Sequence, residues 1–533
     1  MSPAHGRAGQ AHPRLARRLH RITLLPHPRP FKLGKKARIF FQQFRIVGEL
    51  AHAREVLQLA ARLHNFIFSG KIQFMITRGQ SCPIVLLVPA LVLAWTGIAC
   101  GAVDKPAASL YFTLDNGLQV FLQEKHDLPL TAVALAIDIG SKDEGEQTSG
   151  YAHLLEHMLL FGADAERDGE SRLAELRGHG IASNAHTDHD LMTFEVSCPA
   201  AESVWAVERL RQAVFFSRFD AQQLEREKRI ILEEILQLRD DPLSLGRILV
   251  MQQLFSGHPY GQPVFGDGRT IRTATIEQLQ AFGKRLLVPG GCALAVVGDF
   301  SLDEVEKDIR RNWSELPKRV VNAAVIPLAG RLEKNSEQRI ELDINESHLF
   351  FAWRAPEFNH DQRVPLTVLT HILGRGLNPL LNGVLCGGRQ LADQLDMSYL
   401  PLRSGGIVLL HLTLKEKNIR SAKNELSRFL SQLSSLSFGR DDVQRQYQSY
   451  VLDFLESAKN QMTYDNENFR ESALNLGIAV ARFLLMDTVG GSHNYLENVE
   501  KTTSSDLRRV AGKYLSGKKW AVLAIVPLAG KEK

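Results

Sequence analysis

Two kinds of hydrophobic periodicity alternate along the chain from about residue 108 onward. Runs that alternate apolar and polar residues indicate strands, and runs with apolar residues three and four positions apart indicate helices. Asp220 interrupts the longest helical region, and Asp241 with Pro242 is expected to end it. The expected segments are a strand pair within 109–124, strands at 131–139, 181–187, 191–198 and 292–300, and helices at 150–161, from 171, across 201–239 and at 301–313.

The same order of elements begins again after a stretch at 317–331 that reads as a linker. Strands and helices grouped in this way, twice, favour an α+β fold made of two halves of roughly 200 residues each. We place the halves at 103–325 and 333–533. The second set comprises strands at 340–356, 405–415 and 520–527 and helices at 364–375, 421–436 and 442–458.

A strongly apolar run precedes the periodic region. Residues 75–102 contain Met75, one positive charge at Arg78, a largely apolar run at 83–99 and small residues after it. This order is typical of a secretory signal peptide. A retained anchor is an alternative, because the run is at the low end of what spans a bilayer, and lipid attachment at Cys100 is another. We favour a cleaved signal, so that the protein contacts a membrane only if the leader is retained or lipidated.

Residues 1–74 form a basic N-terminal extension with 14 Lys or Arg and two acids, Glu49 and Glu55. A signal at 75–102 could hardly act from inside the chain, so our hypothesis is that the start of the sequence is misassigned. A disordered basic arm or an Arg-rich transit peptide is the alternative.

Charge, composition and cysteines exclude several classes of protein. The formal net charge is +5, but the basic residues are concentrated in the extension, and the body has no basic stripe interleaved with aromatics. This distribution argues against nucleic-acid binding. A composition of 44% hydrophobic and 23% charged residues is that of a folded soluble protein. The five cysteines form no CxxC pair or regular spacing, which argues against a disulfide framework and a cysteine zinc site.

The sequence GYAHLLEHMLLFG at 150–162 carries the strongest chemical signal. His153 and His157 are four residues apart and share one face of a helix, and Glu156 lies between them on nearly the same face. Two neutral imidazoles suit Zn²⁺, and a catalytic zinc also needs a third protein ligand and an open position for water. The order HxxEH inverts the better-known HExxH but supplies the same parts. The alternative is a helix whose histidines are merely core or surface residues.

The segment EREKRIILEEILQLRDDP at 225–242, read as a second helix up to Asp241 and Pro242, offers the third ligand. Glu227 and Glu234 are seven residues apart and therefore lie on one face of this helix. Glu233 is adjacent but about 100° around the helix, and it competes for the ligand role. A solvated acidic face is the alternative interpretation.

The chain resembles the inverted-motif zinc metallopeptidase family of pitrilysin, insulysin and the mitochondrial and bacterial processing peptidases. The resemblance covers about residues 108–530 and implies a bacterial two-domain processing-type member, in which two homologous halves, each a sheet packed against helices, clasp a central chamber. The matching segments are LDNGLQV (114–120), GSKDE (140–144), GYAHLLEHMLLFG (150–162), SNAHT (183–187), EKRIILEEI (227–235), HPYGQPVFG (258–266) and VVGDF (296–300).

The resemblance implies one Zn²⁺ per chain, bound by His153, His157 and Glu234. In the family the ligand glutamate directly precedes an isoleucine or leucine, which selects Glu234 over its neighbour. Glu227 is implied to orient a ligating histidine. The implied activity is that of a zinc-dependent endopeptidase in which Glu156 assists the attack of zinc-bound water on a peptide bond.

The resemblance also implies how substrate binds. Asn184 and Ala185 would lie on an edge strand to which an extended peptide or an unfolded polypeptide segment adds by backbone pairing. We interpret His186 and His189 as strand and turn residues near the cleft rather than as extra ligands. Resemblance to exported members, together with the leader, predicts a bacterial periplasm or cell envelope.

The C-terminal half departs from the family pattern. Family members often carry an Arg and, seven residues on, a Tyr that hold the substrate backbone, but Cys386 and Asp393 stand at these places. Arg389 and Tyr399 are out of register. Either another protein supplies the pair, or this enzyme binds substrate differently and weakly. A homodimer, or a heterodimer with a related subunit, is therefore expected to be possible, and a non-catalytic or partner-dependent subunit is the alternative function. This half has no second HxxEH, and His371 is interpreted as structural.

Overall fold

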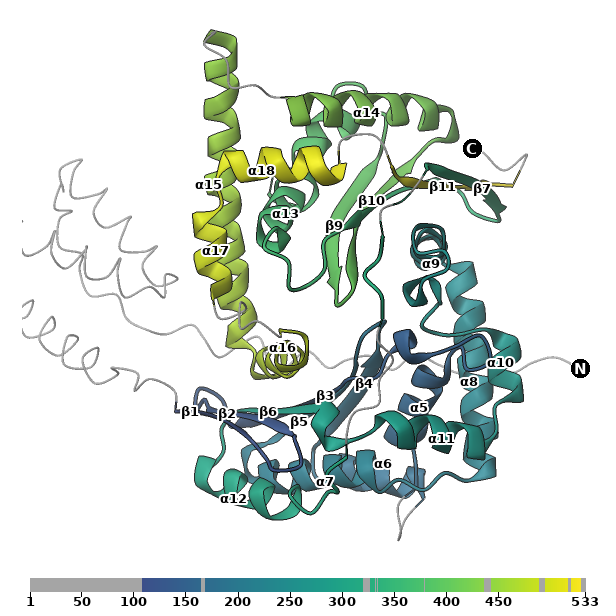
Figure 1. Ribbon diagram of the computed structural model, residues 1–533, viewed down its shortest axis with the longest axis vertical. Coiled ribbons are helices and arrows are strands. Elements are labelled where there is room, and N and C mark those ends of the chain that lie inside the picture. Colours follow the sequence, from purple (N-terminus) through teal and green to yellow (C-terminus); the bar gives the residue numbers. More distant parts are fainter. Residues whose placement is uncertain are drawn as a thin grey trace, which may run out of the picture. The chain divides into compact units, whose positions relative to one another are not determined.

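The computed structural model describes residues 108–163, 168–319, 326–330, 332, 334–377, 379–435, 442–487, 494–515 and 519–528. The extension at 1–74 and the leader at 75–102, for which a signal peptide is expected, lie outside these residues. Contacts divide the chain into a unit at 1–103 and a unit at 104–533, and the description below concerns the second. Two β-sheets, each with its own helices, form this unit (Figure 1).

The first sheet has six strands in the order β1-β2-β6-β3-β5-β4. β2 and β6 are parallel, and every other neighbouring pair is antiparallel. The strands are β1 (Ser109–Thr113), β2 (Gln119–Glu124), β3 (Leu130–Ile137), β4 (Ala182–Thr187), β5 (Met192–Pro199) and β6 (Cys292–Gly298). The helices of this half are α5 (Tyr151–Leu160), α6 (Gly169–Gly178), α7 (Ser203–Phe215), α8 (Ala221–Asp240), α9 (Pro242–Leu254), α10 (Gly268–Thr273), α11 (Ile276–Leu286) and α12 (Leu302–Asn312).

The second sheet has the order β7-β11-β8-β10-β9 and repeats the first sheet without β1. Its β7 and β11 are parallel, like β2 and β6, and its other pairs are antiparallel. The strands are β7 (Ser336–Leu342), β8 (Ser347–Ala355), β9 (Gln394–Leu402), β10 (Gly405–Leu414) and β11 (Ala521–Pro527). The helices are α13 (Arg363–Thr370), α14 (Ile419–Ser435), α15 (Asp442–Glu471), α16 (Ala473–Met486), α17 (Tyr495–Lys501) and α18 (Ser504–Val510). The predicted α+β fold with two sheet-and-helix halves is confirmed.

The central strands of the first sheet use different residue sizes on their two faces. The face that packs on the helices of its own half carries large side chains, including Val133, Leu135 and Leu294, in one core. The opposite face carries alanines, among them Ala134 and Ala295, and packs against α16 of the C-terminal half. Small side chains let a helix approach a sheet closely, so the alanine face fits a helix from elsewhere in the chain.

The N-terminal half likewise places one of its helices on the second sheet. Its α9 packs on β8 and β11 of the second sheet, with Val250 and Leu254 in a shared core with Phe350 and Leu523. Gly246 of α9 lies against the Phe350 ring so closely that a Cβ there would come within 2.2 Å of it. Each half therefore places one helix on the sheet of the other half.

The sequence predicts that a helix ends at Asp241 and Pro242, and the structure shows that a second helix also begins there. The Asp241 carboxylate accepts the backbone N–H groups of Leu243 and Ser244, and Pro242 occupies the first turn of α9. Proline is favoured at this position because its missing N–H would have no helical partner. One residue pair thus ends α8 and starts α9.

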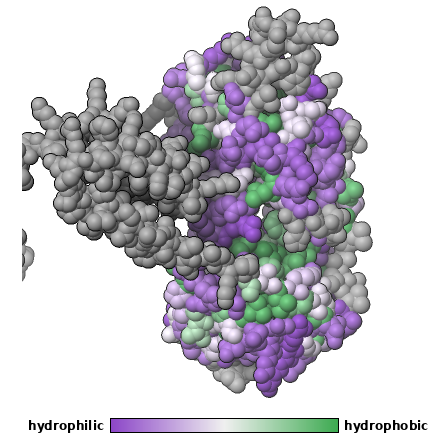
Figure 2. All heavy atoms as spheres, turned by 90° about the vertical axis from the view of Figure 1, so that its left-hand side faces the viewer, coloured by the Kyte–Doolittle hydropathy of each residue, from purple (hydrophilic) through white to green (hydrophobic). Residues whose placement is uncertain are grey.

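Exposed large apolar side chains are scattered over the described residues and include Tyr111, Leu236, Leu377 and Tyr464. On the face drawn in Figure 2, hydrophilic residues cover most of the coloured surface, and hydrophobic residues form smaller areas between them. Within the part of the chain that is described, no helix combines the length and the apolar character that crossing a bilayer requires.

Candidate metal centre

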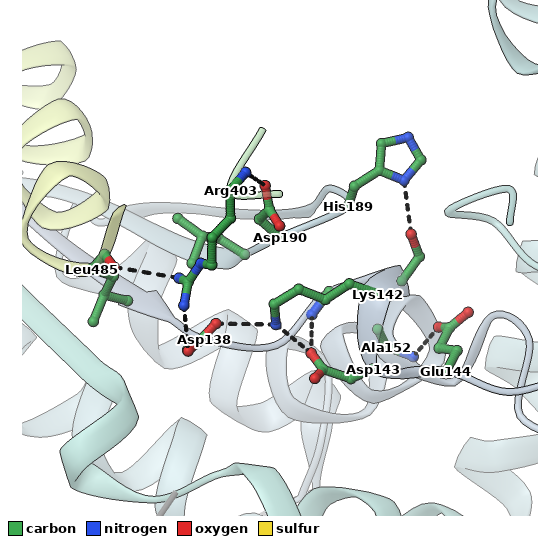
Figure 3. Close-up of polar contacts among 12 residues, drawn as sticks. Asp138, Lys142, Asp143, Glu144, Ala152, His189, Asp190, Arg403 and Leu485 are labelled. Carbon is green, nitrogen blue, oxygen red and sulfur yellow. Dashed lines mark hydrogen bonds and ion pairs between the residues drawn. The ribbon is translucent and has the colours of Figure 1, made fainter. Parts of the chain in front are cut away.

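A carboxylate outside α5 caps the N-terminus of this helix. Its N-cap is Gly150, at φ +89°, which offers no side chain to the free amides of the first turn. Glu144 instead accepts the N–H of Gly150 and of Ala152, both at 2.8 Å, and Figure 3 shows the contact with Ala152. Burial raises the pKa of Glu144 well above its usual value, and the two amide donors offset only part of this effect. A Cβ at Gly150 would lie 2.9 Å from the Gly266 Cα. This position therefore needs glycine because of its positive φ and because of the close approach of Gly266.

The structure brings the three predicted metal ligands together. The Nε2 atoms of His153 and His157 are 3.2 Å apart, and both residues are buried. Glu234 Oε2, from α8, lies 3.7 Å from His153 Nε2 and 3.9 Å from His157 Nε2. Two helices therefore direct two nitrogens and one oxygen at a common point.

The donor set and its spacing fit a zinc ion. Zn²⁺ holds N and O ligands at about 2.0–2.2 Å, which separates tetrahedral ligands by about 3.3–3.5 Å. The distances of 3.2, 3.7 and 3.9 Å are close to this value. Glu234 Oε2 is buried and has no hydrogen-bond partner among the described residues, and a buried oxygen without a partner is unfavourable. A cation bound among these atoms would provide that partner.

The neighbouring glutamates of α8 take different positions. Glu227 is buried, and its Oε2 lies 3.2 Å from His157 Nδ1, on the side of the ring away from the common point. A carboxylate at this place fixes the tautomer and orientation of a ligating histidine. Glu233 is exposed to solvent and takes part in none of these contacts.

Glu156 lies beside the candidate ligands and is held by the edge strand. His153, Glu156 and His157 form a buried group whose ligand atoms lie within 4.8 Å of one another. Thr187 Oγ1, at the end of β4, donates a hydrogen bond of 2.6 Å to Glu156 Oε2. One oxygen of the carboxylate is thus fixed.

Burial shifts the pKa of most titratable groups in the centre. It lowers the pKa of His153 to about 3, with a further contribution from His157. Burial also raises the pKa of Glu156 and of Glu234. For His157 burial alone would lower the pKa, but the hydrogen bond to Glu227 and the surrounding carboxylates raise it. A neutral His153 is the form that binds metal.

A cavity of about 580 Å³ opens over the centre and reaches the edge of the sheet. β4 is the last strand of this sheet and pairs only with β5 among the described strands. Asn184 and Ala185 lie on β4 and line the cavity, together with apolar side chains such as Leu173 and Ile230. A free strand edge beside a cavity can accept an extended segment by backbone pairing.

The two extra histidines take the positions expected for them. His186 lies on β4 and lines the cavity, and its Nδ1 is 2.8 Å from Glu195. His189 lies in the β4–β5 turn, where its Nδ1 is 2.8 Å from the Ser141 hydroxyl. Neither belongs to the group of potential metal ligands found among the described residues.

The C-terminal half offers no comparable centre among its described residues. Cys386 ends a short π-helical turn and packs against the core of this half. The backbone N–H of Asp393 bonds to Thr413 O, next to the start of β9. His371 begins a π-helical turn after α13 and lines a separate cavity of about 210 Å³.

Comparison with known families agrees with this geometry. Residues 119–268 match the family model described as "Insulinase (Peptidase family M16)", and residues 273–450 match "Peptidase M16 inactive domain". The chain belongs to peptidase family M16. The M16 models together include α5, α8 and most of both sheets.

Individual relatives show how distant the sequence relationship is. An uncharacterized zinc protease of Mycobacterium tuberculosis is 29% identical over 284 residues, which are 52% of this chain and 64% of that relative. The chain therefore spans less than two thirds of the relative's length. Zinc protease PqqE of Helicobacter pylori is 22% identical over 75% of this chain and 89% of the relative. The crystal structure of a protease from Helicobacter pylori superposes with a TM-score of 0.70 at 19% identity, over 79% of this chain and 100% of that one.

Proposed function

We propose that this M16 member is a zinc-dependent endopeptidase that hydrolyses extended peptides or unfolded polypeptide segments. The observation that carries the proposal is the meeting of His153 Nε2, His157 Nε2 and Glu234 Oε2 within 3.9 Å, beside the carboxylate of Glu156. The zinc-protease names of the relatives support the same conclusion.

In this proposal His153, His157 and Glu234 hold one Zn²⁺. When bound, the ion would lower the pKa of a water molecule and polarise the peptide carbonyl. Glu156 accepts a proton from the attacking water at its free carboxylate oxygen and then delivers it to the leaving nitrogen as the C–N bond breaks. Thr187 holds the other oxygen, so the carboxylate keeps one orientation during both transfers.

The edge of β4 binds the substrate backbone in this proposal. Asn184 and Ala185 offer backbone groups to an extended segment that lies across the cavity. Backbone pairing recognises conformation more than sequence, so unfolded segments are preferred to folded proteins.

A second candidate is a peptidase that depends on a partner subunit. It is favoured by Cys386 and Asp393, which stand where family members often carry a substrate-holding Arg and Tyr. In that case the zinc centre is intact, but a second chain completes the substrate site. A homodimer or a heterodimer with a related subunit would supply it.

Cleavage of a quenched, unstructured peptide by the purified full-length protein tests these candidates. Glu156→Gln keeps the shape of the side chain but removes the base, so we expect the zinc content to stay at one per chain while turnover falls at least 100-fold. Glu146→Gln, at an exposed position just before α5, is the matched control. Chelator-sensitive cleavage that is lost only in Glu156→Gln supports a self-sufficient peptidase. Bound zinc without cleavage favours the partner-dependent candidate, and absence of zinc binding contradicts both.

We also propose export to a bacterial periplasm or cell envelope, on the strength of the apolar run at 83–99 and its flanks. Cell fractionation with N-terminal sequencing of the mature protein tests this proposal. A mature protein that begins near residue 103 in the envelope fraction supports it, and an uncleaved cytoplasmic protein contradicts it.

A further inference from the structure

The β4–β5 turn of the N-terminal half meets the β9–β10 turn of the C-terminal half. These are equivalent turns, because β4–β5 and β9–β10 occupy the same place in the two sheets. The backbone N–H of Arg403 donates to Asp190 Oδ2 at 2.9 Å (Figure 3). The Tyr260 hydroxyl donates to Asp190 Oδ1 at 2.7 Å and accepts the N–H of Ser404 at 3.0 Å. A fully buried Asp190 and the buried Tyr260 thus join the two turns.

Two arginines of the C-terminal half extend this contact. The Arg403 guanidinium donates to Asp138 Oδ2 at 2.9 Å and to the Leu485 carbonyl at the end of α16 at 3.3 Å (Figure 3). Arg482 of α16 pairs with Asp188 Oδ2 in the β4–β5 turn and donates to Thr193 Oγ1 at 3.2 Å. Burial alone would raise the pKa of Asp188, but Arg482 and the backbone donors hold it below its usual value.

The N-terminal half cannot balance these charges by itself. It contributes Asp138, Asp143, Asp188 and Asp190 to the contact, and Lys142 is its cation there, 3.0 Å from Asp138 and paired with Asp143. Carboxylates removed from water are stable only when they are paired or hydrogen-bonded. Arg403 and Arg482 of the C-terminal half add two positive charges, on Asp138 and Asp188, and neutral donors satisfy Asp190.

The β4–β5 turn also lies next to contacts with α5 and with the segment that precedes this helix. Directly before Asp188, Thr187 donates to Glu156 of α5. The carbonyls of Asp188 and His189 accept the N–H groups of Ser141 and Lys142, at 3.1 and 3.0 Å. Glu144, which follows this segment, caps the first turn of α5. The turn therefore lies one contact from Glu156, through the adjacent Thr187, and two contacts from the N-terminus of α5, the helix that carries both histidines.

We propose that Arg482 and Arg403 are positioning residues, through which the C-terminal half fixes the β4–β5 turn and with it Glu156 and the substrate-binding edge of β4. This inference rests on the proposed function. It assigns a positioning role to the C-terminal half, whose described residues hold no group of potential metal ligands. Neither arginine touches the substrate or the candidate ligands. They act through Asp188, Asp138 and the backbone of the turn.

The test uses the full chain with Arg482→Met, Arg482→Lys and the control Arg509→Met, which removes an exposed ion pair with Asp506 on α18. Three quantities are measured for each protein: zinc content, kcat and KM for the unstructured peptide, and amide hydrogen exchange. In Arg482→Met we expect kcat/KM to fall roughly 10- to 100-fold with the zinc content unchanged, since small misplacement of catalytic groups has effects of this size. Arg482→Lys should recover part of the loss. The amides of Ser141, Lys142, Asp190 and Leu191 should exchange faster in Arg482→Met and at the wild-type rate in the control.

A double-mutant cycle separates positioning from general stabilisation. Asp188→Asn should cause a loss similar to that of Arg482→Met, and the double variant should lose little more, because the two residues act as one unit. Additive losses, or kcat/KM and exchange rates within twofold of wild type, overturn the proposal. If Arg482→Met does not fold, Arg482→Lys and Asp188→Asn carry the same comparison. A wild-type chain without peptidase activity would contradict the proposed function alone, since the exchange rates still report whether the arginine fixes the turn.

Discussion

At the scale of single residues, the candidate centre depends on the carboxylates that surround its histidines as much as on the histidines. Glu227 lies behind His157, Thr187 holds Glu156, and Glu144 satisfies the N-terminus of the helix that carries them. Each of these contacts fixes one orientation of a side chain or helix. The chemistry of the centre therefore requires more than the HxxEH residues.

Replacing Glu227 with Gln should weaken zinc binding roughly 10- to 100-fold, because a neutral amide orients His157 less firmly than a carboxylate. Competition with a chromophoric chelator measures this affinity. Glu225→Gln, at an exposed position on the same helix, is the matched control and should bind zinc like the wild type. Unchanged affinity in Glu227→Gln would show that the ring of His157 is held by other contacts.

Some of these residues could be predicted from the sequence and others could not. His153, His157 and Glu234 lie on two regular helices, so spacing and family resemblance together indicated them. The roles of Thr187 and Glu144 could not be derived in this way, because each depends on a tertiary contact between segments that the sequence does not place together. The sequence predicts Thr187 only as the end of a strand at 181–187, and it indicates Glu144 only through the segment GSKDE, which matches the family.

At the scale of elements, periodicity indicated most strands and helices but not where each packs. The apolar faces of α5, α7 and α8 were evident, whereas α16 and β9 were not anticipated. α16 is apolar around most of its surface, because it lies between a sheet of the other half and its own half. β9 carries Pro401, which is tolerated because β9 is an edge strand but weakens its strand pattern.

Ala134→Leu tests the contact between the alanine face and α16. Ala134 is fully buried, and a Cβ at Gly477 would already be in van der Waals contact with the Ala134 Cβ at 3.7 Å, so the additional carbons of leucine would overlap α16. We expect the free energy of unfolding to fall by about 1–3 kcal/mol. Urea denaturation measures the change, and Ala201→Leu, at an exposed position, should have a negligible effect. Equal stability of both variants would contradict the observed packing.

A pair of histidines on the neighbouring strands β8 and β10 predicts that the protein is less stable to unfolding at acidic pH. His348 Nδ1 lies 3.0 Å from His411 Nε2, and Arg247, Asp241 and Asp396 are the charged groups nearby. Burial lowers the pKa of His411 to about 4, with a smaller contribution from His348.

A histidine whose pKa is lowered in the folded state contributes stability above its unfolded pKa of about 6.5, and this contribution is lost as the pH falls towards 4. The urea midpoint should therefore decrease between pH 7 and pH 5, and the decrease should be smaller in His411→Gln. His126→Gln is a suitable comparison, because contact with Asp299 raises the pKa of His126 and reverses the sign. An identical pH dependence in wild type and His411→Gln would refute this account.

At the scale of the whole described chain, the exchange of α9 and α16 makes the two halves mutually dependent. Without the C-terminal half, the alanine face and the apolar side of α9 would both be exposed to water. We expect the separate pieces 108–319 and 326–533 to be insoluble when expressed alone and to co-purify as a complex when expressed together. Size-exclusion chromatography measures this, and soluble, monomeric, cooperatively unfolding pieces would contradict it.

The matching sheet orders and the exchanged helices suggest how a chain of only one half would behave. A chain that ended after one half would carry a helix for which its own sheet has no place and a sheet face that lacks a cover. Two copies of such a chain would satisfy each other across a twofold axis, with the same surface used by both partners. Fusion of the two copies into one polypeptide makes their stoichiometry fixed and their sequences independent. One copy can then keep the ligands while the other replaces them, and the arginines on the second copy can specialise in holding the first.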